Sequence, residues 1–168
     1  DTRAMARGYA AIYRELLSAA PPAGPVPCVA VLAVDDVVSD ARGTTPSRLR
    51  ERVRKAVGRS VTYELVHWAA FVSATRPHWD AVLVEPGAVP VEHIDELAGR
   101  VEALGIPLLL DVVDRTAATS HHGPNASQRV IERLARAAEQ IVVSHDALAQ
   151  RMHGHGAAVR VVPDALNE

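Results

Sequence analysis

Short apolar runs alternate with amphipathic segments along most of this chain of 168 residues. Nearly continuous runs, typical of parallel strands covered on both faces, lie within residues 28–36, 80–87, 106–114 and 140–146. Alternating runs at 60–68 and 158–163 predict two further strands. The remaining segments carry helical spacing or helix end signals, and they predict helices at 2–20, 44–58, 69–77, 89–105, 125–139 and 146–156.

Strand and helix therefore alternate about six times, which is the pattern of an α/β layer structure. The sequence predicts one three-layer Rossmann-like domain over residues 1–168, with a mostly parallel sheet of about six strands and helices on both faces. In such sheets, ligands bind outside the carboxyl ends of the strands. A binding site is therefore expected at that edge.

Charge and composition narrow the class of partner. The 18 Lys and Arg residues and 20 Asp and Glu residues give a net charge of −2, so we expect no nucleic-acid partner. The sequence shows neither a secretory signal nor an apolar run of about 18 residues, and a cytoplasmic location is expected. The single cysteine, Cys28, heads an apolar run, which predicts a buried, reduced thiol.

Polar side chains stand where the predicted strands end. Asp36 follows the first strand, Glu85 follows the third, Asp111 and Asp114 close the fourth, and Ser144 closes the fifth. Carboxylates at this edge can orient hydroxyl groups, hold a divalent ion or act as a general base. The simpler interpretation is that strand-end residues cap the following helix or turn.

Two histidines, His121 and His122, follow the fourth strand and are candidates for a catalytic base above the same edge. Neither G-x-G-x-x-G after the first strand nor G-x-x-x-x-G-K-[ST] occurs, so a dinucleotide or P-loop phosphate site is not predicted. No set of Cys and His has the spacing of a zinc site, and the histidines at 121–122 and 153–155 lie in loops that contain glycine. No metal site is predicted.

One segment is strongly basic. Residues 42–59 hold seven Arg or Lys residues against the single acid Glu51. A basic face on a helix at 46–57 suits anionic lipid headgroups or a phosphorylated acceptor, and Arg42 and Arg48 lie near its start. We therefore expect a peripheral contact at the inner face of the membrane. The alternative is a solvated helix face balanced by acids elsewhere.

The last third of the chain carries short motifs in a recognisable order. An Asp-rich strand end is followed by Ala138-Glu139, Val143-Ser144, Leu148-Ala149 and the stretch Val-Val-Pro-Asp-Ala at 161–165. This order resembles the second half of the N-terminal domain of GT-B glycosyltransferases, especially of the family 4 type. Glu139 stands where that family usually has Asp, and Asp164 where it usually has Asn. The first half, from "VDDVVSDARGTTPSRLRERV", fits more loosely, because Asp35-Asp36-Val37 replaces the common Gly-Gly loop.

The resemblance implies transfer of a sugar from a nucleotide-sugar donor to a sugar, lipid or other acceptor, without a further cofactor. This chain would supply the acceptor side. A second domain beyond residue 168 would make most of the donor contacts, so the chain alone is expected to be inactive. No Glu here has another Glu eight positions on, so the E-x7-E pair of retaining donor domains is missing.

The same resemblance suggests roles for the candidate residues. Asp114 and one of His121 and His122 would orient or deprotonate the acceptor hydroxyl. The residues expected to bind substrate are Asp36, Arg42, Arg48, Asp111 and Ser144.

A second resemblance belongs to a different class of protein. The stretches "VLAVDD" and "WDAVLVEPGAVPVEHIDELAGRVEALGIPLLL" are similar to response-regulator receiver domains. Glu85 stands where the phosphoacceptor Asp of a receiver would be, and Ser144-His145-Asp146 lacks the Lys expected after strand five. The alternative function is therefore a receiver-like or other flavodoxin-like signalling or binding module without catalysis.

Overall fold

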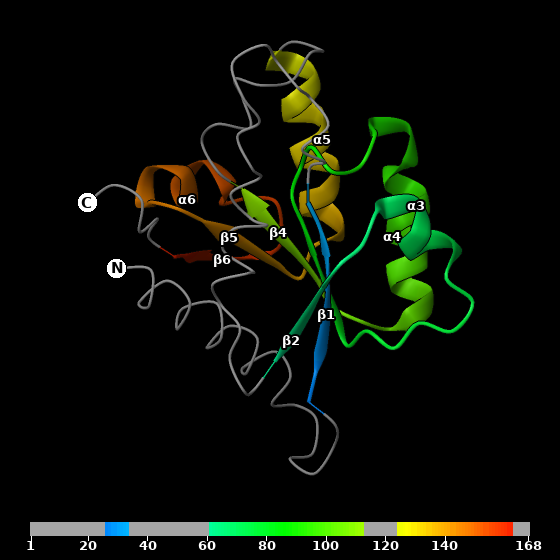
Figure 1. Cartoon of the computed structure of the whole chain (residues 1–168). Helices are drawn as coiled ribbons and strands as arrows, with labels where there is room; N and C mark the ends of the chain where they lie inside the picture. The colour runs from blue at the N-terminus through cyan, green and yellow to red at the C-terminus, as the bar shows by residue number, and fades with distance from the viewer. Residues whose placement is uncertain (1–25, 34–60, 113–123, 163–168) are drawn as a thin grey trace, which may run out of the picture.

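The computed structural model describes residues 26–33, 61–112 and 124–162, which form one sheet flanked by helices (Figure 1). The strands are β1 (Cys28–Leu32), β2 (Thr62–Leu65), β3 (Ala81–Val84), β4 (Leu108–Val112), β5 (Gln140–Val143) and β6 (Ala158–Val161). The helices are α3 (Trp68–Ser73), α4 (Ile94–Leu104), α5 (Pro124–Ala137) and α6 (Asp146–Met152), and the 3-10 turn η1 (Val91–His93) precedes α4. Every described strand pairs in parallel, so the predicted α/β Rossmann-like fold with six strands is confirmed.

The strands lie in the order β2-β1-β3-β4-β5-β6. β2 therefore lies on one side of β1. β3 lies on its other side, and β4, β5 and β6 follow in sequence beyond β3. The first five strands have the flavodoxin-like order, and the reversal falls between β1 and β3. There the backbone N–H of Glu85 donates to the carbonyl oxygen of Leu32 at 2.9 Å, which joins the carboxyl ends of the two strands.

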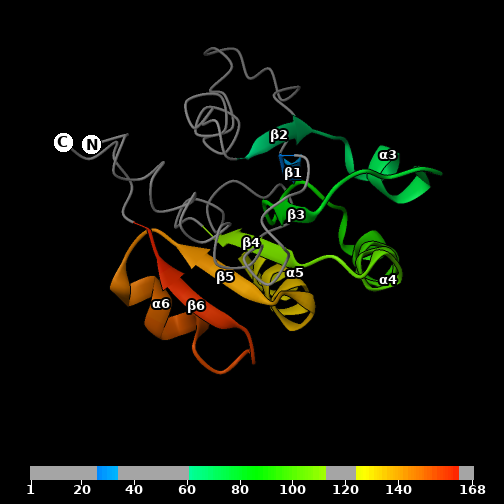
Figure 2. The ribbon, with the colours of Figure 1, turned by 90° about the horizontal axis from the view of Figure 1, so that it is seen from below.

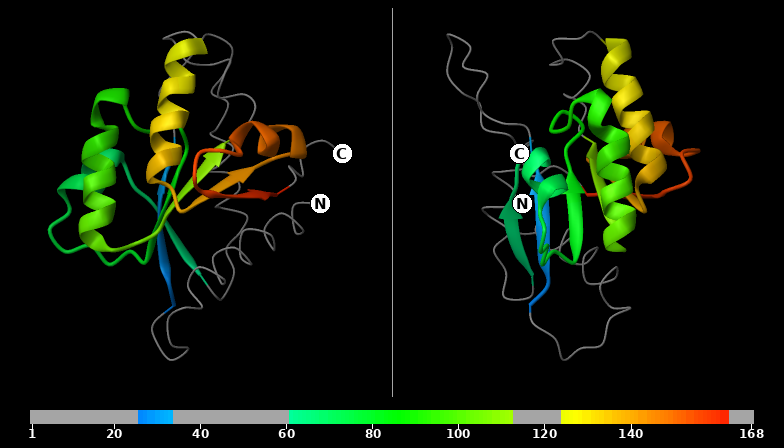
Figure 3. Two further views of the ribbon diagram at one scale, coloured as in Figure 1. Left: turned by 180° about the vertical axis from the view of Figure 1, so that it is seen from behind. Right: turned by 90° about the vertical axis from the view of Figure 1, so that its right-hand side faces the viewer.

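Both faces of the sheet are buried. One face packs against α3 to α6, which contribute Phe71, Leu97, Leu134 and Leu148 to the core, and Figures 2 and 3 show these helices along that face. On the other face, six side chains are no more than 1% exposed: Val29, Val31, Ala81, Leu83, Leu109 and Val142. Burial on both faces explains why the central strands read as continuous apolar runs. The helices expected at 2–20 and 44–58 lie outside the described residues.

The last predicted strand joins the sheet at its edge. β6 pairs with β5 in the register Val159 with Ile141, and the N–H of Val162 donates to the carbonyl oxygen of Val143 at 2.8 Å. β2 forms the opposite edge, and both edge strands carry exposed positions. These positions account for the alternating pattern of the two strands, because an edge strand is less covered than a central one.

Gly105 ends α4 in the left-handed conformation, with φ at 63°, and its N–H donates to the carbonyl oxygen of Glu102. A Cβ raises the energy of this conformation by about 1–2 kcal/mol, so Gly105→Ala should lower the free energy of unfolding by about 1 kcal/mol. Gly99→Ala is the matched control, because Gly99 lies inside α4 with nothing within 4 Å of an added Cβ. It should raise the free energy of unfolding by about 0.5–1 kcal/mol. Urea unfolding followed by circular dichroism measures both, and changes of the same sign would contradict the assigned helix end.

Candidate functional site

The structure describes two of the residues predicted to form a site at the carboxyl edge, Asp111 and Ser144. The others lie outside the described residues: Asp36, Arg42, Arg48, Asp114, His121 and His122. The basic segment 46–57 also lies outside them, so its proposed contact with an anionic surface stays a prediction.

Asp111 lies near the end of β4, where it pairs with Val142 of β5. Its side chain points to the same face as Leu109 and Val142, because side chains alternate along a strand. Only 2% of its surface is exposed. A residue this buried offers almost no surface to an acceptor.

Glu85 and Ser144 extend the strands on either side of β4 and are half-buried. In the strands that they follow, Leu83 and Val142 face the same side of the sheet as Asp111. We call Glu85, Asp111 and Ser144 the carboxyl-edge cluster. The three residues belong to three neighbouring strands of the sheet or directly follow them, and such strands are about 4.8 Å apart. The sequence already places Glu85 after the third strand, and the strand order now sets it beside Asp111 and Ser144.

Other polar residues at this edge cap helices. The Nδ1 atom of His145 accepts a hydrogen bond from the N–H of Leu148 at 3.2 Å, and His67 caps α3 through Ala69 at 3.3 Å. An accepting Nδ1 leaves the proton of the neutral ring on Nε2. For these two histidines the structure supports the simpler interpretation of strand-end polar residues, which is capping.

Aromatic rings lie near the same edge. Trp68, the first residue of α3, stacks on His93 with ring centroids 4.3 Å apart, and Nδ1 of His93 is 3.0 Å from Oε2 of Glu96. Trp68 and Trp79 are partly buried and pack against the core. The stacked Trp68–His93 pair therefore joins the start of α3 to the start of α4 beside the carboxyl edge.

Tyr63 on β2 points to the opposite face of the sheet from α3. Burial raises the pKa of its phenol to about 12, so the side chain is neutral at physiological pH. At that pH it can donate or accept a hydrogen bond, but it does not supply a negative charge.

One group of side chains with the chemistry of a metal site exists among the described residues, formed by Cys28, Glu64 and His78. Cys28 is free and half-buried, not buried as its place in an apolar run predicts, because it is the first residue of its strand. The group lies at the amino edge, where β1 begins, and so is separate from the carboxyl-edge cluster.

Within the described segments, no helix combines the length and apolar character needed to cross a bilayer. Comparisons with protein-family models, with curated proteins and with solved structures found no match for this chain.

Proposed function

We propose that this chain is the acceptor-side domain of a glycosyltransferase that uses a nucleotide-sugar donor. The observation that carries the proposal is the place of β6. It runs parallel to β5, and the N–H of Val162 bonds to Val143, so Val161 and Val162 of the motif lie at the carboxyl edge, which supports the GT-B resemblance. The reversal of strand order between β1 and β3 lies at the same edge, and ligands of open α/β sheets bind at such a reversal.

In this proposal the carboxyl-edge cluster lines the acceptor side of the crevice. The half-buried Glu85 and Ser144 would hydrogen-bond acceptor or donor hydroxyls, and Asp111 would hold the edge in place. Asp114 and one of His121 and His122 would orient and deprotonate the attacking hydroxyl, and Asp36, Arg42 and Arg48 would bind further polar or anionic groups. Donor contacts would come mainly from a second domain, so the chain alone would not transfer sugar.

The basic helix expected at 46–57 also suggests where in the cell the protein acts. A cytoplasmic protein with this segment would approach the inner face of the membrane, where anionic lipids attract Arg and Lys. A lipid-linked acceptor would then lie close to the crevice.

One observation favours a second candidate. The order of the first five strands is the flavodoxin-like one, which is also the order of receiver domains. A flavodoxin-like binding module without catalysis would use the same carboxyl edge for a flavin phosphate or a phosphoryl group. This candidate therefore differs from the first in its ligand.

Ligand-observed saturation-transfer NMR on the tag-free chain distinguishes the two. We expect UDP-glucose or GDP-mannose to bind with a dissociation constant of about 1 mM, because in this proposal a second domain supplies most donor contacts. Ser144→Ala should weaken this binding about 2- to 10-fold, the value of one hydrogen bond, whereas Ser73→Ala should not change it. Ser73 is a fair control because its hydroxyl bonds within α3 to the carbonyl oxygen of Ala69.

Two outcomes would contradict the proposal. If no nucleotide-sugar signal is seen at millimolar concentration, the carboxyl edge does not bind the donor. Tight binding of flavin mononucleotide would favour the flavodoxin-like alternative.

A further inference from the structure

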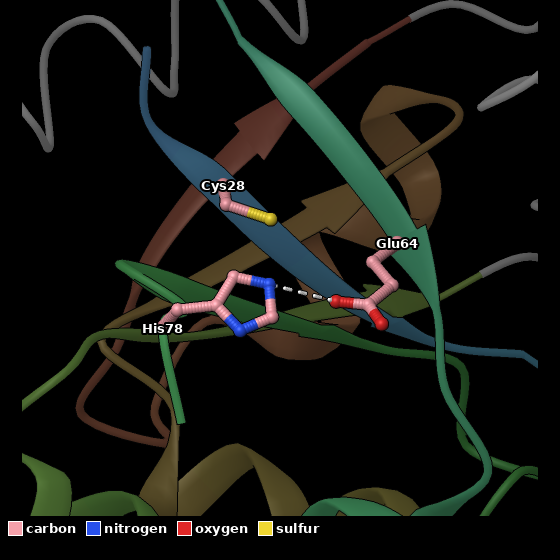
Figure 4. Close-up of side chains that lie close together, drawn as sticks. All are labelled: Cys28, Glu64 and His78. Atoms are coloured by element: carbon pink, nitrogen blue, oxygen red, sulfur yellow. Dashed lines mark ion pairs between the residues drawn. The ribbon is translucent and has the colours of Figure 1, made fainter. Parts of the chain in front are cut away.

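Cys28, Glu64 and His78 converge at the amino edge of the sheet (Figure 4). Cys28 begins β1, Glu64 lies on the neighbouring edge strand β2, and His78 comes from the loop that joins α3 to β3. In register, Cys28 pairs with Thr62 and Ala30 with Glu64, so the thiol and the carboxylate project from the same face of adjacent strands. We call these three residues the amino-edge triad.

The ligand atoms of the amino-edge triad are close enough for one ion. Nε2 of His78 and Oε2 of Glu64 are 3.1 Å apart, and the three candidate ligand atoms all lie within 4.8 Å of one another. Ligands around a tetrahedral zinc ion, with bonds of about 2.0–2.3 Å, are about 3.3–3.8 Å apart. Small rotations of the exposed Glu64 and His78 side chains would close the remaining gap.

Neighbouring groups already hold two members of the amino-edge triad in place. The indole Nε1 of Trp79 donates to Oε2 of Glu64 at 2.7 Å, and the indole ring is itself stacked on the buried Phe71. Oδ2 of Asp80 accepts a hydrogen bond from the backbone N–H of Cys28 at 2.8 Å. Such outer contacts orient ligands in known metal sites, and Asp80 adds a second negative charge beside the site.

We propose that the amino-edge triad binds one zinc ion, or a transition-metal ion of similar preference, through the Cys28 thiolate, a His78 nitrogen and a Glu64 carboxylate oxygen. A set of one sulfur, one nitrogen and one oxygen ligand suits Zn²⁺ better than Mg²⁺ or Ca²⁺, which prefer oxygen alone. Binding would break the exposed His78–Glu64 pair, which costs little because such surface pairs are weak.

Glu64 and His78 have side chains that are 46% and 65% exposed. A fourth coordination position would therefore face solvent, where water or a substrate oxygen could bind, as in zinc sites that keep one position open. The site lies at the opposite edge from the carboxyl-edge cluster, and this inference does not depend on the proposed function.

Titration of the reduced, tag-free chain with Co²⁺ tests the site, because cobalt reports thiolate and tetrahedral ligation by its absorption. We expect one equivalent to bind, with a sulfur-to-cobalt charge-transfer band in the near ultraviolet and intense visible bands. Zn²⁺ should displace the cobalt, with a dissociation constant of about 1 µM or below.

Variants identify the ligands. Cys28→Ser should abolish the charge-transfer band, and Glu64→Gln and His78→Gln should each weaken zinc binding by more than about 100-fold, because loss of a ligand exceeds loss of an outer contact. Trp79→Phe keeps the ring on Phe71 but removes the donor to Glu64, and should weaken binding about 10- to 100-fold. His153→Gln, at the exposed end of α6, is the matched control and should change nothing.

Two results would overturn the inference, provided that circular dichroism shows each variant to be folded. One is cobalt binding without a thiolate band in the unmodified chain. The other is affinity that stays the same in Glu64→Gln and His78→Gln, which would indicate a thiol that binds metal on its own.

Discussion

Replacing Leu109 with alanine should lower the free energy of unfolding by about 2–5 kcal/mol, and replacing its neighbour Leu110 should lower it by a similar amount. The two side chains point to opposite faces of β4, and both are 0% exposed. Each truncation removes apolar contacts and leaves a cavity in a covered face. Equal effects are the signature of a parallel sheet buried on both sides.

Urea unfolding of the two variants beside the unmodified chain measures this prediction. Leu65→Ala supplies the control, because Leu65 lies on edge strand β2 and is 37% exposed, so its truncation should cost about 1 kcal/mol or less. The prediction is contradicted if Leu109→Ala lowers the free energy of unfolding by only about 1 kcal/mol while Leu110→Ala lowers it by much more. That result would mean that the sheet face opposite α3 to α6 is exposed to solvent.

Replacing Phe71 with alanine should lower the free energy of unfolding by about 3–5 kcal/mol. Phe71 is the buried anchor of the short helix α3 and stacks on Trp79 with ring centroids 5.0 Å apart. The same substitution should also weaken metal binding, because the ring of Trp79 loses the surface that positions its indole N–H toward Glu64.

Leu134→Ala separates the two effects. Leu134 is also 0% exposed, but it belongs to α5, on the far side of α4, so it should cost a comparable amount of stability without changing cobalt affinity. Unfolding and cobalt titration on the same two variants test the coupling. If both variants weaken the metal site equally, the effect comes from general loss of stability and not from the stack.

The strands could be read from the sequence because each is decided by a local pattern. The run that forms β3 is wholly apolar, and β4 departs from this only at Asp111, which is the pattern of a doubly covered strand; Gly105 ends α4 where the sequence places the stop. The start of α4 was less predictable. It follows Pro90 and the turn η1, so the regular helix begins at Ile94, several residues inside the predicted segment.

The order of the strands could not be read locally, because it depends on the side of β1 to which the chain returns. Asp111 shows the same limit for the candidate site: its position at a strand end is visible in the sequence, but its burial depends on packing. The amino-edge triad was missed because its members come from three segments far apart in the chain, whereas zinc spacing rules recognise neighbours.

The central claim is that the carboxyl edge is the ligand-binding edge, and amide chemical shifts of the ¹⁵N-labelled chain test it most directly. On addition of a nucleotide sugar, we predict shifts concentrated at Glu85, at Val112 and at Ser144 to Asp146, with Cys28, Thr62 and His78 unchanged. Shifts centred on the latter three residues, or spread evenly over both edges, would contradict the account.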